Sequence, residues 1–253
     1  MKNVVTENIL GYEVTTENKV DCIKKIQEWL CENSCSYYFV CANPHSIQVA
    51  QNDENFMSAL KSADLVTPDG IGIVLASKIL RGDIKDRVTG SDIFWGLSEA
   101  LNSAKKGRYF FLGSTEGVLT QIKDKISKEF PGIEIVGTYS PPFNSEFSDD
   151  ENNKMIDAIN AANPDVLWVG MTAPKQEKWI YKNKDKLNVK FIGAIGAVFD
   201  FYAGTVKRSH PAFQRFGLEW LPRLLQEPKR LWRRNFISNP MFMFRVLKQR
   251  LGK

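Results

Sequence analysis

The chain alternates between short apolar runs and segments of helical period. The apolar runs lie at 37–41, 64–67, 108–112, 133–136, 166–169 and 190–192, and the helical segments at about 70–80, 91–105, 115–129, 150–161 and 174–185. Strands that are apolar without alternation are buried on both faces, which is typical of parallel sheets joined by helical crossovers. The pattern therefore predicts an α/β fold with a doubly wound, mostly parallel sheet.

The segment ahead of this pattern predicts two further elements. Residues 9–14 favour a hairpin or edge strand around Gly11. A helix should follow, because Val20, Ile23 and Ile26 recur at helical spacing. We expect Thr16 to cap this helix and residues 33–34 to end it.

Beyond Gly204 the chain becomes aromatic and basic, without strand signals. Residues 204–253 hold 12 of the 34 Lys and Arg residues but only 2 of the 29 Asp and Glu residues. We expect a Rossmann-like catalytic domain at 1–203 and a helical, Arg-rich appendage at 204–253. The charge favours an anionic partner such as phospholipid, nucleic acid or a phosphorylated substrate. Interleaved Arg and aromatic residues suit a lipid headgroup layer, and a helix that simply covers the core is the alternative.

Two features indicate a cytoplasmic protein. The first residues lack an apolar signal region, and no run approaches the roughly 18–20 apolar residues that span a bilayer. All four cysteines lie between residues 22 and 41, where disulfides would staple little of the core. We therefore expect a reducing compartment.

Ligands of doubly wound sheets bind beyond the carboxyl ends of the strands. Candidate binding residues at these ends are Asn43, Thr67, Gly113, Tyr139, Gly170 and Gly196. Glycine there lets backbone N–H groups approach a phosphate at a helix N-terminus, although each is also a common turn residue. The strand after Gly113 ends at Tyr139 without the acid that binds a nicotinamide dinucleotide's ribose. The pattern favours a nucleotide sugar over NAD.

Two carboxylates are candidates for chemistry in this crevice. Asp69, between Pro68 and Gly70 at a strand end, is suited to general-base work, and a helix N-cap is the equally weighted alternative. Asp200 lies among apolar residues, so it needs a partner such as ribose hydroxyls, a uracil edge, an Arg or a backbone N–H. No Asp-x-Asp pair and only two histidines occur, so we predict no metal site.

Longer motifs give the chain a resemblance to the WecG/TagA/CpsF family of bacterial glycosyltransferases over nearly its whole length. The motifs are Ala42-Asn43-Pro44, Thr67-Pro68-Asp69-Gly70-Ile71-Gly72, Arg87-Val88-Thr89-Gly90-Ser91-Asp92, Gly170-x-x-x-Pro174-Lys175-Gln176-Glu177-x-Trp179, Gly193-x-x-Gly196-x-x-x-Asp200 and Gly217-Leu218-Glu219-Trp220-x-x-Arg223-Leu224-x-x-Glu227-Pro228-x-Arg230. The last run is highly specific.

The resemblance implies transfer of a hexose or N-acetylhexosamine, most often N-acetylmannosamine, from a UDP-sugar to a polyprenyl-diphosphate-linked sugar. Such transfer serves teichoic acid or surface polysaccharide synthesis and needs no cofactor besides the UDP-sugar substrate. It also implies a peripheral enzyme on the inner face of the bacterial plasma membrane.

The same resemblance assigns roles to individual residues. Asp69 is the base, Asn43 and Gln176 hold the donor or acceptor sugar, Arg87 lies near the reacting groups, and Asp200 helps to hold the uridine. The appendage arginines that would close over the pocket are Arg223, Arg230 and Arg233. Cys41 stands where family members often carry a threonine, so the sugar contact there and the donor identity stay open.

General chemistry agrees with these roles. One carboxylate suffices to take the proton of an attacking hydroxyl, and in-line displacement inverts the anomeric centre. Without a metal, helix N-termini and arginines would stabilise the departing diphosphate.

The alternatives to a glycosyltransferase are another Rossmann-like enzyme, such as a dehydrogenase, or a nucleic-acid-binding protein. Met and Phe crowd residues 241–244, which argues against nucleic acid. A homo-oligomer is left open.

Overall fold

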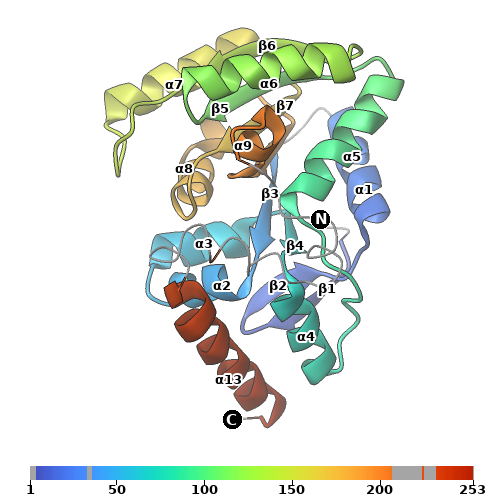
Figure 1. Cartoon of the computed structure of the whole chain (residues 1–253), viewed down its shortest axis with the longest axis vertical. Coiled ribbons are helices and arrows are strands. Elements are labelled where there is room, and N and C mark those ends of the chain that lie inside the picture. The colour runs from blue at the N-terminus through green and yellow to red at the C-terminus, as the bar shows by residue number, and fades with distance from the viewer. Residues whose placement is uncertain (1–3, 33–35, 207–223, 225–231, 253) are drawn as a thin grey trace.

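The computed structural model describes residues 4–32, 36–206, 224 and 232–252, and its centre is a six-stranded sheet (Figure 1). The strand order is β4-β3-β8-β7-β5-β6, and every neighbouring pair is parallel. The strands are β3 (Tyr37–Ala42), β4 (Leu65–Pro68), β5 (Arg108–Gly113), β6 (Glu134–Tyr139), β7 (Val166–Gly170) and β8 (Phe191–Ala194). The predicted parallel α/β architecture is confirmed.

Helices cover both faces of this sheet, which explains the apolar character of its strands. Along β5, Phe110 and Leu112 belong to one hydrophobic cluster, whereas Tyr109 and Phe111 belong to a second cluster on the opposite face. The first face is covered by α2 (Pro44–Ala50), α3 (Glu54–Ser62), α4 (Ile71–Leu80), α7 (Asp149–Ala162), α8 (Lys175–Asn183) and α13 (Asn239–Arg250). The second face is covered by α1 (Lys19–Cys31), α5 (Gly90–Ser103), α6 (Glu116–Glu129) and α9 (Val198–Ala203). The described residues also form two short helical segments, η1 (Lys184–Lys186) and the π-helical η2 (Arg234–Ser238).

The predicted hairpin around Gly11 is confirmed as β1 (Thr6–Ile9) paired with β2 (Tyr12–Thr15). The predicted cap of α1 is wrong, because the backbone N–H and hydroxyl of Thr16 both donate to the Val5 carbonyl. Asn18 caps the helix instead, and its side chain accepts from the backbone N–H groups of Val20 and Asp21. The helix begins at Lys19, once the chain has left the hairpin.

Two helices, α2 and α3, had no counterpart among the predicted elements. Each is short and begins with a side-chain cap: Asn43 accepts from Ser46 N, and Asp53 accepts from Phe56 N. Pro44 in the first turn of α2 is also a common helix-starting signal. Asn43 and Asp53 are therefore the residues from which the starts of α2 and α3 could have been predicted.

The C-terminal helix α13 packs on α2 and α4 (Figure 1). Phe242 and Val246 are fully buried in this contact. Gln249 ties the helix to the β1–β2 hairpin, because its Oε1 accepts from Leu10 N at 2.8 Å and its Nε2 donates to the Asn8 carbonyl at 3.0 Å. No helix within the described ranges is both long and apolar enough to cross a membrane.

Candidate functional site

The carboxyl ends of β3 and β4 bring four of the predicted site residues into one neighbourhood. Cys41 pairs with Thr67 in the register of the two strands, and the Thr67 hydroxyl lies 3.6 Å from the Cys41 sulfur. The backbone N–H of Asp69 donates to the Ala42 carbonyl at 2.8 Å. Asn43, next along the chain, uses its side chain to cap α2 and is partly buried. Parallel pairing thus fixes where Asn43 and Asp69 leave the sheet.

Asp69 is not a helix cap, so the structure overturns that alternative. The N-cap of α4 is Gly70, which makes no side-chain capping bond and has a φ of 95°. This φ lies in the left-handed region, which glycine adopts without strain. Gly70 therefore occupies the N-cap position of α4, and Asp69 precedes it, partly buried at the end of β4.

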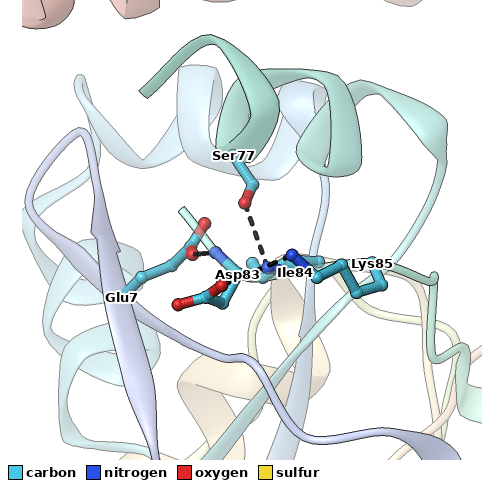
Figure 2. Close-up of polar contacts among 5 residues, drawn as sticks. All are labelled: Glu7, Ser77, Asp83, Ile84 and Lys85. Atoms are coloured by element: carbon cyan, nitrogen blue, oxygen red, sulfur yellow. Dashed lines mark hydrogen bonds and ion pairs between the residues drawn. The ribbon is translucent and has the colours of Figure 1, made fainter. Parts of the chain in front are cut away.

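Arg87 is carried to the same edge by the segment that follows α4. Figure 2 shows how this segment is held: Glu7 Oε2 accepts from Asp83 N at 2.6 Å, and Ser77 Oγ accepts from Ile84 N at 3.1 Å. The backbone N–H of Val88 then donates to the Pro68 carbonyl at 2.9 Å. Arg87 therefore lies one residue from a contact with the end of β4.

A close approach of two backbones shapes the edge between β5 and β7. Gly113 pairs with Gly170, and a Cβ on Gly113 would lie 2.4 Å from the Gly170 carbonyl oxygen. Gly113 also has a φ of 125°. Just beyond it Thr115 caps α6, so the N-terminus of this helix opens at the same edge of the sheet. Such a terminus favours an anion.

Tyr139 ends β6, where it pairs with Leu112 and packs partly buried against the first hydrophobic cluster. The next residue, Ser140, donates its hydroxyl hydrogen to the Ser114 carbonyl at 2.8 Å. This contact joins the chain after β6 to the chain after β5. Tyr139 therefore borders the region where α6 begins.

Gln176 is positioned in the first turn of α8 with its side chain 5% exposed. Its Oε1 accepts from Met171 N at 3.3 Å, and its Nε2 donates to Glu177 Oε1 at 2.8 Å. A Cβ on Gly196, which has a φ of 50°, would lie 3.4 Å from Gln176 Oε1. The amide therefore joins the chain after β7 to the chain after β8.

Asp200 lies in the first turn of α9 and is partly buried. The Thr205 hydroxyl lies 3.5 Å from its Oδ1, and the Asp200 carbonyl accepts from Gly204 N and Val206 N. The Thr205 hydroxyl is therefore a local polar partner of this carboxylate. Its position beyond β8 keeps it at the same edge as Gly196.

Glu177 is a functional candidate that the sequence reasoning did not single out. It is 4% exposed, and burial raises its pKa to about 7. The signal was present, because α8 buries Trp179, Ile180 and Asn183 together with Gln176. That spacing places position 177 on the inward face of the helix, where a carboxylate is unusual.

The electrostatics around Cys41 link three of these groups. Burial raises the pKa of the Cys41 thiol well above its usual value, and the negative charges of Asp69 and Glu177 raise it further. The Thr67 hydroxyl acts in the opposite sense. Cys41 is therefore a neutral thiol, and the carboxylates of Asp69 and Glu177 both lie close enough to influence it.

The predicted appendage residues Arg223 and Arg230 lie outside the described residues. Arg233 is exposed, and its guanidinium carbon lies 5.7 Å from the centre of the Trp232 ring. Elsewhere on this segment, exposed Met241, Phe244 and Leu247 line the outer side of α13. In the part of the chain that the structure describes, no three His, Cys, Asp or Glu side chains gather as a possible metal site.

Known proteins resemble this chain over almost its full length. A sequence model of the glycosyl transferase WecG/TagA/CpsF family matches residues 7–253. A protein of Bacillus spizizenii is 36% identical over 211 residues, which cover 83% of this chain and 79% of the relative. A Bacillus subtilis protein is 30% identical over 98% of this chain and 93% of its own length. A Staphylococcus aureus protein is 26% identical over 97% of this chain and 94% of its own length.

All three relatives carry the name N-acetylglucosaminyldiphosphoundecaprenol N-acetyl-beta-D-mannosaminyltransferase. The family match spans the strand ends that carry Asn43, Asp69, Gln176 and Asp200 as well as the C-terminal helix. This chain is a glycosyltransferase and belongs to the WecG/TagA/CpsF family.

Proposed function

We propose that this enzyme transfers N-acetylmannosamine from UDP to N-acetylglucosamine carried on a polyprenyl diphosphate, as a step of teichoic acid or surface polysaccharide synthesis. The names of the relatives support the transferred sugar and the acceptor. The UDP donor suits the glycine-lined strand ends and the position of the α6 N-terminus at the same edge of the sheet. The observation that carries the proposal is the position of Asp69 at the end of β4, beside Cys41 and one residue before the N-cap of α4.

In the proposed reaction Asp69 acts as the general base. Its carboxylate takes the proton of an acceptor hydroxyl while the hydroxyl oxygen bonds to the anomeric carbon of the donor sugar. The bond from that carbon to the diphosphate oxygen breaks at the same time, and UDP leaves with the electron pair. Attack from the side opposite the leaving group inverts the anomeric configuration, and one carboxylate is sufficient for this step.

The departing diphosphate needs positive charge or hydrogen-bond donors. We propose that Arg87, close to the end of β4, and the N-terminus of α6 supply part of this stabilisation without a metal ion. Arg223, Arg230 and Arg233 are the proposed contributors from the appendage, and only Arg233 lies among the described residues. Asn43, Gln176 and Asp200 keep their proposed roles in binding the sugars and the uridine.

We also propose that the enzyme works on the cytoplasmic face of the bacterial plasma membrane, where a polyprenyl acceptor is found. The exposed apolar residues of α13 and the cationic C-terminal segment support this placement. Apolar side chains would enter the headgroup layer while Arg and Lys contact lipid phosphates. Lipid binding would then bring the appendage arginines to the pocket only where the acceptor is present.

The test compares Asp69→Asn with Asp157→Asn, a matched change of an exposed aspartate on α7. The assay combines UDP-N-acetylmannosamine with a short-chain lipid-diphosphate-N-acetylglucosamine and determines the molecular mass and amount of the product. We expect Asp69→Asn to lower turnover about 10²- to 10⁴-fold, as for loss of a general base, with UDP affinity nearly unchanged. Asp157→Asn should behave as the wild type.

Two results would contradict the proposal. Wild-type turnover in Asp69→Asn would remove this residue from the role of base. A strict requirement for manganese, seen as loss of turnover in a chelator and recovery on adding the ion, would refute the metal-free mechanism.

A further inference from the structure

Glu177 combines deep burial with an incomplete set of hydrogen bonds. Its side chain is 4% exposed, and its Oε1 accepts from Gln176 Nε2 at 2.8 Å. The other oxygen, Oε2, is buried and has no hydrogen-bond partner among the described residues. A buried ionised carboxylate in this condition is costly, whereas a neutral carboxyl group is much less so.

The basic side chains around α8 are directed to other partners. Lys175 donates to the Asn144 carbonyl and lies over the Phe147 ring, and Lys178 pairs with Asp53 at 3.0 Å. Neither Lys175 nor Lys178 therefore pairs with Glu177 to stabilise its ionised form.

The remaining elements packed against α8 give the same picture. On α3, Lys61 lies over the Tyr12 ring, and on η1, Lys184 lies over the Tyr38 ring. The strand β8 carries no ionisable side chain. Toward the sheet, Glu177 acts electrostatically on the neutral Cys41 thiol, as does Asp69. Burial among these groups therefore raises the pKa of the Glu177 carboxyl group without protonating it fully at neutral pH.

Glu177 is connected to the proposed sugar-binding residue Gln176 by a direct hydrogen bond. The Gln176 amide is held at both ends, by Met171 N on its Oε1 and by Glu177 Oε1 on its Nε2. This arrangement fixes which end of the amide donates and leaves a single Nε2 hydrogen for a further partner. An uncharged Glu177 still accepts this bond through its carbonyl oxygen.

We propose that Glu177 is a positioning residue that orients Gln176 and takes up a proton from solvent when the anionic nucleotide sugar binds. The inference rests on the proposed function, because the donor's diphosphate brings two negative charges to the strand ends. Like charge disfavours an ionised carboxylate, so the buried group is neutralised. The proton goes from water to Glu177 Oε2 on binding and returns to water when UDP leaves.

The expected size of the effect follows from the free enzyme. With a pKa of about 7, Glu177 is mostly ionised at pH 7.5 and mostly protonated at pH 6. Full protonation in the complex therefore corresponds to uptake of ~0.8 proton per site at pH 7.5 and ~0.1 at pH 6.

The test is calorimetric titration with UDP-N-acetylmannosamine in buffers of different ionisation enthalpy. This ligand's diphosphate is a diester, so it has no group of its own that titrates near pH 7. We expect the wild type to show the stated uptake at the two pH values. Glu177→Gln, which mimics the neutral acid, should bind the ligand within a few-fold of wild type and show no uptake at either pH. The matched control is Glu151→Gln, a partly buried glutamate on α7 whose pKa is lowered by hydrogen bonds to Ser148, and it should keep the wild-type uptake.

Infrared difference spectra of the wild type supply a second measurement that needs no folded variant. A protonated carboxyl band should grow when the ligand is added at pH 7.5. Binding without uptake or without this band would overturn the inference and leave the proposed function intact. Uptake that persists in Glu177→Gln would assign the proton to another group, such as His45, whose pKa is lowered by burial. Failure of UDP-N-acetylmannosamine to bind at all would overturn the proposed function and this inference with it.

Discussion

The two faces of α13 predict opposite consequences for two phenylalanines that lie two residues apart. Phe242 is fully buried against the first hydrophobic cluster, whereas Phe244 is 59% exposed. Replacing Phe242 with Ala should lower the free energy of unfolding by about 3–5 kcal/mol, the usual cost for a buried phenylalanine. Phe244→Ala should cost less than about 1 kcal/mol, because the ring's one described polar contact is Lys248 Nζ at 4.9 Å from its centre.

Membrane binding should show the reverse order. Burying a whole phenylalanine side chain gains about 1.5–3 kcal/mol, and the exposed 59% of Phe244 scales this to about 1–2 kcal/mol. Phe244→Ala should therefore weaken binding to anionic phospholipid vesicles about 5- to 20-fold. Phe242→Ala, measured below its unfolding temperature, should bind vesicles like the wild type.

The assays are urea unfolding followed by circular dichroism and sedimentation with vesicles of anionic or neutral lipid. Equal losses of stability in both variants would mean that α13 does not pack through Phe242. Unchanged vesicle binding of Phe244→Ala would mean that the outer side of α13 does not enter the lipid, and the proposed membrane placement would lose its structural support.

Two further predictions concern the sheet and its thiols. Gly170→Ala should lower the free energy of unfolding by about 1–3 kcal/mol, because its Cβ would lie 2.4 Å from the Phe199 ring. The control in the same urea assay is Gly117→Ala, whose Cβ meets nothing within 4 Å, and this change should not destabilise the protein. Equal behaviour of the two variants would contradict the close packing at the end of β7. For the thiols, iodoacetamide at pH 8 with mass spectrometry should label exposed Cys31 before buried Cys22. Burial raises the pKa of Cys22 to about 12, so its thiolate is ~10³-fold scarcer than that of a free cysteine, and early labelling of Cys22 would contradict its burial.

The sequence predicted the strands well because a parallel sheet covered on both faces demands continuous apolar runs. Once β3 and β4 are parallel, the residues that follow them must emerge at one edge, so the sequence alone predicts that Asn43 and Asp69 lie together. Whether Asp69 or Gly70 occupies the N-cap of α4 could not be predicted in this way. It depends on the backbone conformation at Gly70, which a single sequence does not specify.

Glu177 shows a different limit. Its burial follows from the period of α8, but its unpaired oxygen depends on which way the neighbouring amide and lysines turn. Lys175 and Lys178 flank Glu177 in the sequence, and charge counting alone would pair one of them with it. In the structure Lys175 lies over Phe147, and Lys178 reaches Asp53. Tertiary packing determines which groups a long side chain can reach, and sequence spacing does not determine that packing.

The position of α13 gives the C-terminal segment a physical connection to the site. Its two supports, α2 and α4, are the helices that leave β3 and β4 directly after Asn43 and Asp69. Phe242 and Val246 belong to the same cluster as Ile47 of α2 and Ile73 of α4, so these helices and α13 share one packed core. Close-packed interiors transmit displacement rather than absorbing it. A change that shifts α13 along its supports would therefore act on the two strand ends that carry the proposed base and its neighbour, without any direct contact between the helix and the sugar.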